Sequence, residues 1–229
     1  GKYGVDTLRW YFYTFSHPWD AKAFAERDLQ QVMRKFILTL WNSFAFYQTY
    51  KSKGRYKLPA ASYKIPNALD RWIVSRLHGT IREATSCMDA HDITGAARRL
   101  EQFVIEDLSL WYIRRSRQRF QNPKTKKELQ EASDTLHYVL LETSKLVAPF
   151  APFLAEYIYG EIGGKGSVHW QDWPHFSAKK ADTRGKPGID KNLEAEMVRV
   201  REVVAKGLSE RAKAGVKVRQ PLQKLKVKS

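Results

Sequence analysis

The sequence predicts an all-α fold, an antiparallel helix bundle with a short C-terminal extension. Apolar residues recur at intervals of three and four along several long segments, as they do on one face of an amphipathic helix. Almost no segment shows the alternation of apolar and polar residues that is typical of strands. The loops between these segments are short, which favours antiparallel neighbours in a bundle.

The first three predicted helices span residues 5–15, 26–50 and 67–90. Pro18 ends the first, because proline disfavours a helical run directly before it. Asn67 is expected to cap the third, since an asparagine side chain accepts hydrogen bonds from the first backbone N–H groups of a helix.

The rest of the chain contains four more predicted helices. They span residues 92–120, 124–147, 152–162 and 189–214. Asp92 is the expected N-cap of the first of these, and Trp111 is expected at the centre of its apolar face. Pro152 suits the first turn of a new helix. Ser167–Trp170 is predicted to be a short extended piece.

The domain organisation follows from these elements. Residues 1–174 are expected to form the bundle, and 175–188 read as a linker rich in Lys, Asp, Gly and Pro. Residues 189–229 are expected to hold a final helix and the start of a following domain, because apolar and polar residues alternate near the end as in a strand. The missing initiator Met indicates an excised fragment.

The amino-acid composition indicates which kinds of partner and which cellular compartment to expect. The chain has 40 basic and 24 acidic residues, a net charge of +16, which favours a polyanionic partner or an anionic membrane surface over a simple solubility bias. No apolar run reaches the roughly 18 residues of a membrane span, and we expect no membrane association. One cysteine, Cys87, cannot form an internal disulfide, so we expect a reducing, cytoplasmic location.

The helix predicted over 92–120 carries a charged residue on its core face. Asp107 lies on the same face as the apolar stripe, and Arg76 lies on the core face of the helix before it. One interpretation pairs the two, because a buried charge needs a partner. The other is that the bundle opens at this end and its arginines meet a ligand. For Asp107 and Arg76 the sequence favours the ion pair.

The C-terminal end of the same helix is the densest basic segment of the chain, and we assign it a surface role in binding RNA. Its candidate residues are Arg114, Arg115, Arg117, Gln118, Arg119 and Lys124. Arginine forks contact phosphates, and aromatic or guanidinium planes stack on unpaired bases, so this composition favours RNA loops and no DNA partner is expected. The next candidates are Arg34, Lys35 and Arg219.

No catalytic or metal-binding pattern is recognised. Lys51–Gly54 is a basic helix end without the glycine spacing of a phosphate-binding loop. The six histidines are scattered without ligand spacing. From the residues alone, the chain is a basic helical RNA-binding module that has no catalytic residues, no metal site and no cofactor of its own.

Six segments, in order along nearly the whole chain, resemble motifs of one known protein family. Gly4–Arg9 (G-V-D-T-L-R) is similar to the signature G-A-D-A-L-R that opens the anticodon-binding domain of class I synthetases, with Val5 and Thr7 in place of alanines. Leu69–Leu77 resembles a helix shared by the isoleucyl and valyl enzymes. The other four segments resemble sequences of the isoleucyl-tRNA synthetase family, although Leu110 replaces an arginine. They are Glu106–Arg114, Leu146–Phe153, Ser167–Pro174 and Val216–Leu222.

The resemblance implies an isoleucine–tRNA ligase whose anticodon-binding module binds tRNA(Ile) and works with the rest of its own synthetase chain. ATP and Mg would belong to the full-length enzyme. The H-I-G-H and K-M-S-K-S motifs and the editing domain are absent from this sequence, so the chain alone is expected to be inactive. Pro18–Asp20 and Leu40–Asn42 suggest the archaeal and eukaryotic-like branch. The same module of a valyl enzyme, or a free-standing helical RNA-binding protein, stays open as an alternative.

Overall fold

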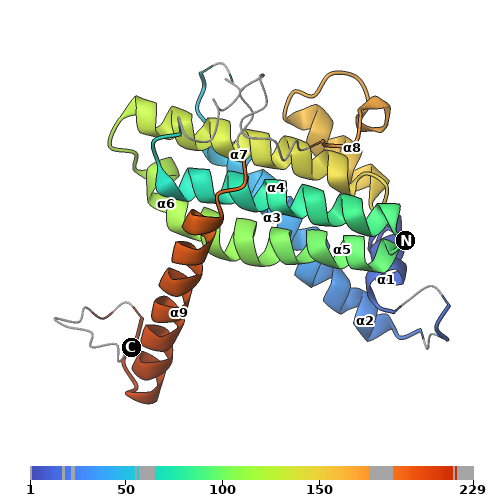
Figure 1. The fold of residues 1–229 in the computed structure, drawn as a ribbon, viewed down its shortest axis with the longest axis horizontal. Coiled ribbons are helices and arrows are strands. Elements are labelled where there is room, and N and C mark those ends of the chain that lie inside the picture. The colour runs from blue at the N-terminus through green and yellow to red at the C-terminus, as the bar shows by residue number, and fades with distance from the viewer. Residues whose placement is uncertain are drawn as a thin grey trace. The chain divides into compact units, whose positions relative to one another are not determined.

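The computed structural model describes residues 2–16, 19–21, 24–54, 56, 65–175, 188–218 and 220. The chain divides into two units, Gly1–Ile189 and Asp190–Ser229, and each is considered by itself. The described part of the first unit is helical and contains no strand, which confirms the predicted all-α class (Figure 1).

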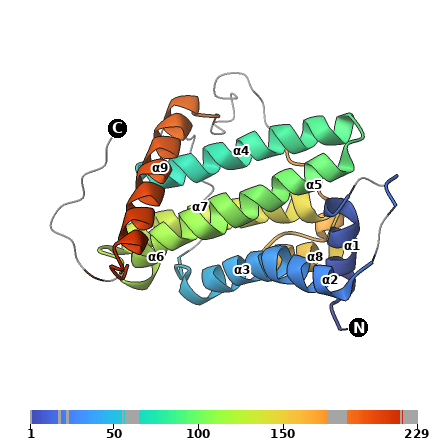
Figure 2. The same cartoon turned by 90° about the horizontal axis from the view of Figure 1, so that it is seen from below.

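The first unit is a bundle of long helices with shorter ones at its ends (Figures 1 and 2). The ends of its long helices lie within a few residues of the predicted ones. Its elements are α1 (Val5–Thr14), α2 (Glu26–Val32), the π-helix η1 (Met33–Ile37), α3 (Leu38–Tyr50), α4 (Ala68–Asp89), α5 (Ile93–Gln102), the π-helix η3 (Phe103–Ile113), α6 (Arg114–Gln121), α7 (Lys126–Val147), α8 (Pro152–Glu161) and the 3₁₀ turn η4 (Val168–Trp170).

The predicted helix caps are present. The side chain of Asn67 accepts hydrogen bonds from the backbone N–H groups of Leu69 and Asp70 at the start of α4. Asp92 accepts one from Gly95 at the start of α5. These local bonds satisfy backbone donors that have no partner inside the helix, which is why both helices begin where the sequence places them.

A π-helical segment lies inside each of two long predicted helices. Met33–Ile37 interrupts the helix over 26–50, and Phe103–Ile113 interrupts the helix over 92–120. A π-helix has more residues per turn than an α-helix, so it changes which side chains face the core. Trp111 is therefore only half-buried and Tyr112 is fully buried. The expectation that Trp111 occupies the centre of the core face is wrong, because it rested on uniform α-helical geometry.

Aromatic side chains fill much of the core where α1 meets the other helices. The ring of Trp10 stacks on that of Phe36 at 3.5 Å between centroids, and Phe150 lies edge-on to Trp10 at 5.8 Å. All three side chains are essentially inaccessible to solvent. Burial of such large rings gives α1, a helix of 10 residues, its fixed place in the bundle.

The segment Ser167–Trp170 is not extended as predicted. Val168–Trp170 forms a 3₁₀ turn, in which the Ser167 side chain accepts a hydrogen bond from the backbone N–H of His169. The carboxylate of Glu156, from α8, accepts hydrogen bonds from the Ser167 hydroxyl and the Val168 N–H. Short apolar runs do not distinguish a strand from a turn, and here a partner on another helix decides between them.

The second unit contains α9 (Lys191–Lys213), capped by the side chain of Asp190. This agrees with the helix predicted over 189–214. The predicted linker lies almost entirely outside the described residues, as does most of the strand-like C-terminal end. The domain boundaries at 174 and 188 therefore stay predictions.

Candidate nucleic-acid interface

Five of the predicted RNA-binding side chains gather on α6 and the loop that follows it. Arg114, Arg115, Arg117, Gln118 and Lys124 are all exposed, and we call this set the basic turn. On the opposite side of α6, Ser116 and Phe120 are buried. The helix is therefore anchored by its apolar face and presents its cationic face to solvent.

An aromatic plane lies directly beside these cations. The guanidinium of Arg115 sits over the ring of Trp111, 4.7 Å from the centroid, in cation–π geometry. Trp111 precedes it by one turn and is half-buried. The basic turn thus offers charged forks for phosphates next to a flat stacked pair of the kind that contacts unpaired bases.

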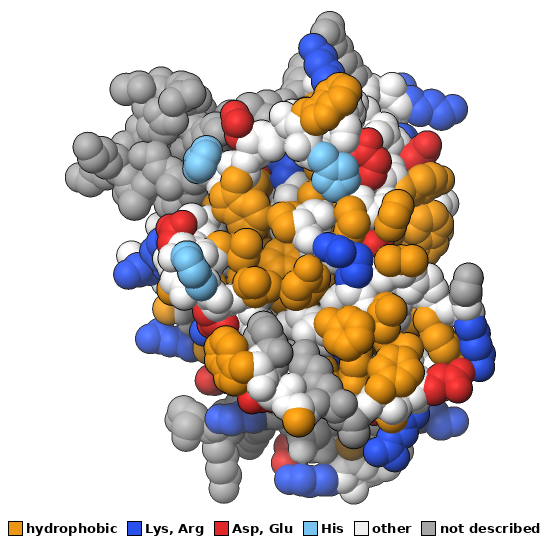
Figure 3. Space-filling view, turned by 90° about the vertical axis from the view of Figure 1, so that its right-hand side faces the viewer, with side chains coloured by type: hydrophobic (Ala, Val, Ile, Leu, Met, Phe, Trp, Pro, Cys, Tyr) orange, Lys and Arg blue, Asp and Glu red, His pale blue; other side chains and the backbone are white. Residues whose placement is uncertain are grey.

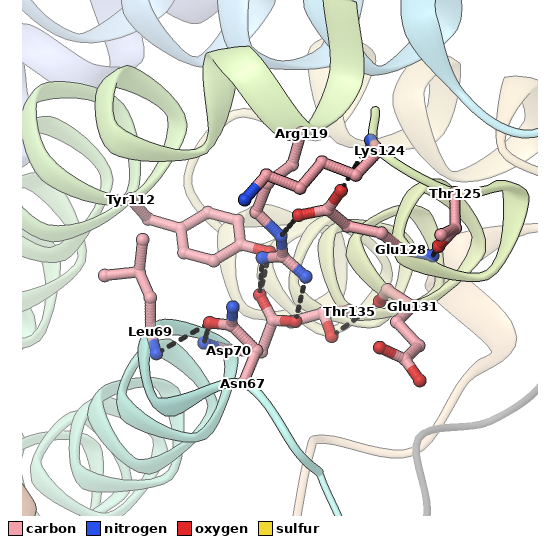
Figure 4. Close-up of polar contacts among 10 residues, drawn as sticks. All are labelled: Asn67, Leu69, Asp70, Tyr112, Arg119, Lys124, Thr125, Glu128, Glu131 and Thr135. Carbon is pink, nitrogen blue, oxygen red and sulfur yellow. Dashed lines mark hydrogen bonds and ion pairs between the residues drawn. The ribbon is translucent and has the colours of Figure 1, made fainter. Parts of the chain in front are cut away.

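Arg119 differs from the other predicted binding residues, because its guanidinium is used inside the protein. It donates from Nη1 to Oδ1 of Asp70 at 2.7 Å and from Nη2 to Oδ2 at 2.8 Å (Figure 4). Its side chain is 11% exposed and that of Asp70 is 0% exposed. The expected surface role of Arg119 is corrected here: a carboxylate 49 residues earlier in the chain pairs with it.

Two more groups complete the environment of this ion pair. The hydroxyl of Tyr112 donates to Oδ1 of Asp70 at 2.8 Å, and Glu128 approaches Nε of Arg119 at 3.8 Å. Burial acts to lower the pKa of Arg119, but the hydrogen bond and charge of Asp70 outweigh it and the pKa is raised. Burial, followed by the charge of Asp70, raises the pKa of Tyr112. Arg119 is thus cationic and Tyr112 neutral at any physiological pH.

The same cluster fixes the loop that carries Lys124. Glu128 accepts a hydrogen bond from the backbone N–H of Lys124, while its own N–H donates to the hydroxyl of Thr125 (Figure 4). This reciprocal pair caps the start of α7, with Thr125 as the N-cap and the carboxylate of Glu128 bound to the residue before it. It holds the backbone of Lys124 and leaves the side chain exposed.

The remaining predicted binding residues lie elsewhere. Arg34 and Lys35 are exposed on η1, but Lys35 pairs with Glu101 of α5 at 2.7 Å. The neighbouring α2 and the basic turn on α6 lie at opposite ends of the bundle (Figure 2). Arg219 lies outside the described residues.

A cavity of about 360 Å³ lies beside Lys35, between α1, α2 and α5. Charged groups along its wall are engaged with other parts of the protein: Lys35 pairs with Glu101, and Arg98 donates to the carbonyls of Thr14 and Phe15 at the end of α1. This arrangement closes a helix end and provides no nucleophile activated by a base.

The predicted ion pair inside the bundle is confirmed. Nε of Arg76 donates to Oδ2 of Asp107 at 2.9 Å, and the Asp107 side chain is almost fully buried. The charge on the core face of this helix therefore has a structural partner, and it does not mark an open end of the bundle.

Within the described ranges, no three His, Cys, Asp or Glu side chains are grouped so that they could hold a metal ion. No described helix combines the length and apolar character needed to cross a membrane.

The chain matches one protein family over most of its length. The family described as "Anticodon-binding domain of tRNA ligase" matches residues 70–227. The chain belongs to this family of tRNA ligase anticodon-binding domains. The basic turn and its supporting ion pair lie inside the matched region.

Curated relatives agree with the family. The chain is 40% identical over 226 residues to isoleucine–tRNA ligase 2 of Bacillus thuringiensis subsp. konkukian, with 98% of this chain and 21% of the relative covered. It is 37% identical over 230 residues to isoleucine–tRNA ligase of Deinococcus radiodurans, with 100% of this chain and 20% of the relative covered. The chain thus spans about one fifth of the length of these relatives. Both are bacterial, and they give no support to the suggested archaeal and eukaryotic-like branch.

A solved structure supports the fold of the anticodon-binding domain. A leucyl enzyme from Agrobacterium radiobacter, in a ternary complex with tRNA and LeuAMS, covers 84% of this chain with a TM-score of 0.53 and 16% sequence identity. At that identity the likeness concerns the fold alone.

Sequence reasoning missed the partner of Arg119. Asp70 lies three residues before Ile73 and seven before Leu77, on the buried face of the helix predicted over 67–90. The same signal, an acidic residue on an apolar stripe, had pointed to Asp107. It could have marked Asp70 as a second buried carboxylate in need of a cation.

Proposed function

We propose that this domain binds the anticodon stem-loop of tRNA(Ile) and positions the tRNA for isoleucylation by the catalytic part of an isoleucine–tRNA ligase. The observation that carries the proposal is the basic turn: exposed cations of one helix and its following loop, with Arg115 stacked on Trp111, in a chain of the anticodon-binding family. ATP and Mg would act in the catalytic part of the enzyme, in the cytoplasm.

The specificity for isoleucine rests on the relatives. They are named isoleucine–tRNA ligases and match nearly the whole chain at about 40% identity. These names favour the isoleucyl assignment over a valyl one. Membership of the family weighs against a free-standing RNA-binding protein.

The proposal is tested by titrating the chain against three tRNAs of equal length: tRNA(Ile), the same tRNA with a changed anticodon, and tRNA(Val). We expect the unmodified tRNA(Ile) to bind most tightly and the binding to weaken as salt is raised. Equal affinity for all three at every salt concentration would reduce the function to non-specific binding of RNA. Tighter binding of tRNA(Val) would favour the valyl alternative.

An apolar face at the α1 end of the bundle supports the rest of the synthetase chain as a second partner. Val5, Leu8, Phe12 and Phe15 recur along α1 and just beyond it and are exposed, while Trp10 and Tyr11 of the same helix are buried. Figure 3 shows apolar side chains crowded on this end of the molecule. Contiguous apolar surface of this kind marks an interaction site, and the relatives contain about four fifths of their length outside the matched part.

This second partner is tested in the complete ligase with Leu8→Asp and Phe12→Ser together. We expect isoleucine-dependent pyrophosphate exchange to persist and transfer of isoleucine to tRNA to fall, because the two parts of the enzyme would lose their fixed geometry. Leu110→Ser, at an exposed apolar residue on η3, is the matched control. Unchanged transfer in the double variant would refute docking at this face.

A further inference from the structure

The buried ion pair between Asp70 and Arg119 calls for an explanation other than stability. Two charges removed from water cost free energy that their attraction only partly returns, and apolar residues of similar volume often stabilise a protein as well or better. Arg119 also stands among four exposed cations, Arg114, Arg115, Arg117 and Lys124. An arginine that faces inward there adds to the charge repulsion of the segment.

The position of Arg119 indicates what the ion pair accomplishes. Its guanidinium is bound to Asp70 in the first turn of α4 and approaches Glu128 in the first turn of α7, while Arg119 itself belongs to the last turn of α6. Glu128 in turn holds the backbone of Lys124. One guanidinium therefore joins three helix ends, and both parts of the basic turn, α6 and the following loop, are fixed to it (Figure 4).

The geometry of the contact restricts rotation of α6. Two parallel N–H···O bonds of 2.7 and 2.8 Å fix the plane of the guanidinium, which a single ammonium group cannot do. The hydroxyl of Tyr112 also donates a hydrogen bond to the carboxylate of Asp70. Tyr112 lies on η3, the element directly before α6. The two carboxylates, Asp70 and Glu128, also offset part of the repulsion among the exposed cations.

We propose that Arg119 is a positioning residue for RNA binding: through Asp70 and Glu128 it holds the basic turn in the arrangement that the RNA backbone meets, without touching the RNA itself. The inference rests on the proposed function, because it assumes that the basic turn is the RNA-binding surface. A surface ordered before binding loses less conformational freedom when the ligand arrives, so its affinity is higher for the same contacts.

Asp70→Asn distinguishes positioning by Arg119 from direct contact of Arg119 with RNA, because the two roles predict opposite changes in tRNA affinity. The variant raises the net positive charge by one and releases Arg119. If Arg119 can bind phosphate, tRNA affinity rises and the plot of log K against log salt becomes steeper by about 0.7 to 0.9. If Arg119 positions the basic turn, affinity falls on the order of tenfold with the slope little changed.

Arg119→Lys and Arg119→Gln form the second comparison. A lysine keeps the charge but cannot form the paired bonds to Asp70. Positioning predicts that both variants lose a similar share of affinity and keep the wild-type salt slope. A direct contact predicts that Arg119→Lys binds almost as wild type while Arg119→Gln loses about one phosphate contact from the slope.

General loosening of the bundle is controlled with Arg76→Gln, which removes the cation from another buried carboxylate, Asp107. Titrations are made at a temperature where circular dichroism shows every variant folded. Equal loss of affinity in Arg76→Gln at a matched melting temperature would overturn the proposal. If Asp70→Asn does not fold, Glu128→Gln, at a carboxylate 27% exposed, gives the same comparison with a smaller perturbation.

A parallel variant, Arg114→Gln with Arg117→Gln, distinguishes failure of this inference from failure of the proposed function. If it binds tRNA as wild type does, the basic turn is not the interface and the positioning role of Arg119 is overturned, while the proposed function stands with an interface elsewhere on the domain. If it weakens binding while Asp70→Asn strengthens it, the interface stands and the positioning role of Arg119 is overturned.

Discussion

The carboxylate of Asp6 accepts a hydrogen bond of 2.6 Å from the backbone N–H of Leu154, 148 residues further along the chain. Leu154 lies in the first turn of α8, where backbone donors have no partner within the helix. Arg9, on the same helix as Asp6, donates to the carbonyls of Pro149 and Phe150 at 3.0 and 3.1 Å. Two charged residues of α1 thus close the turn between α7 and α8 from both sides.

Asp6→Ala is expected to lower the free energy of unfolding by about 1 to 2 kcal/mol, because α8 loses its N-terminal acceptor. Urea denaturation of the isolated chain measures this. Asp172→Ala, at an exposed carboxylate, serves as the control and should change stability by less than about 0.5 kcal/mol. Equal stability of Asp6→Ala and wild type would show that water replaces the cap.

Tyr112 should contribute more to stability than its neighbour Trp111, despite the larger ring of the tryptophan. Tyr112→Ala removes a fully buried side chain and is expected to cost about 3 to 5 kcal/mol. Tyr112→Phe keeps the ring but loses the hydrogen bond to Asp70, and it should cost about 1 kcal/mol. Trp111→Ala should cost less than half as much as Tyr112→Ala. Thermal melts of the three variants check the order, and a larger loss for Trp111→Ala would contradict the π-helical register.

His137 should make the stability of the bundle depend on pH. Its Nδ1 lies 2.9 Å from the hydroxyl of Tyr47, and its ring stacks on Tyr56 at 3.6 Å. Burial, and to a smaller degree the charge of Lys51, lowers the pKa of His137 to about 4. Between pH 6.5 and 4 the unfolded chain therefore binds a proton that the folded chain does not, and stability falls as pH is lowered through this window.

The size of this effect is about 2 kcal/mol between pH 7.5 and pH 5, from the shift of the His137 pKa. Titration of carboxylates also contributes over this range, so the informative quantity is a difference. His137→Phe keeps a ring against Tyr56 and cannot titrate. The loss of stability on acidification should be smaller in this variant than in wild type, and identical losses would mean that His137 is protonated in the folded protein.

Salt dependence reports how many phosphates the basic turn contacts. Arg114→Gln together with Arg117→Gln should flatten the slope of log K against log salt by about 1 to 2 units, since each lost phosphate contact contributes about 0.7 to 0.9. Both residues are exposed, and the melting temperature should not change. Arg27→Gln with Arg82→Gln removes two exposed cations from α2 and α4 and should leave the slope as in wild type. The reverse pattern would place the interface away from α6.

The sequence by itself determined the long helices of this protein and, to within a few residues, where they begin and end. Helical periodicity located the long helices, and Asn67 and Asp92 marked two of their starts, because capping is a local interaction between residues two or three apart. The ion pair of Arg76 and Asp107 could also be predicted from the sequence, since both residues lie on the apolar stripes of adjacent helices. The basic composition of α6 is likewise visible without a structure.

Only the tertiary structure decided which of these side chains are exposed to solvent and which are buried or paired inside the protein. The registers of η1 and η3 depend on packing between helices, so uniform α-helical geometry placed Trp111 where Tyr112 lies. Arg119 looks like its exposed neighbours in sequence, but Asp70 reaches it only when α4 and α6 lie together. The physical reason is the same in both cases. Periodicity and capping are set within a few residues, whereas the partner of a buried charge is set by which distant segments pack against it.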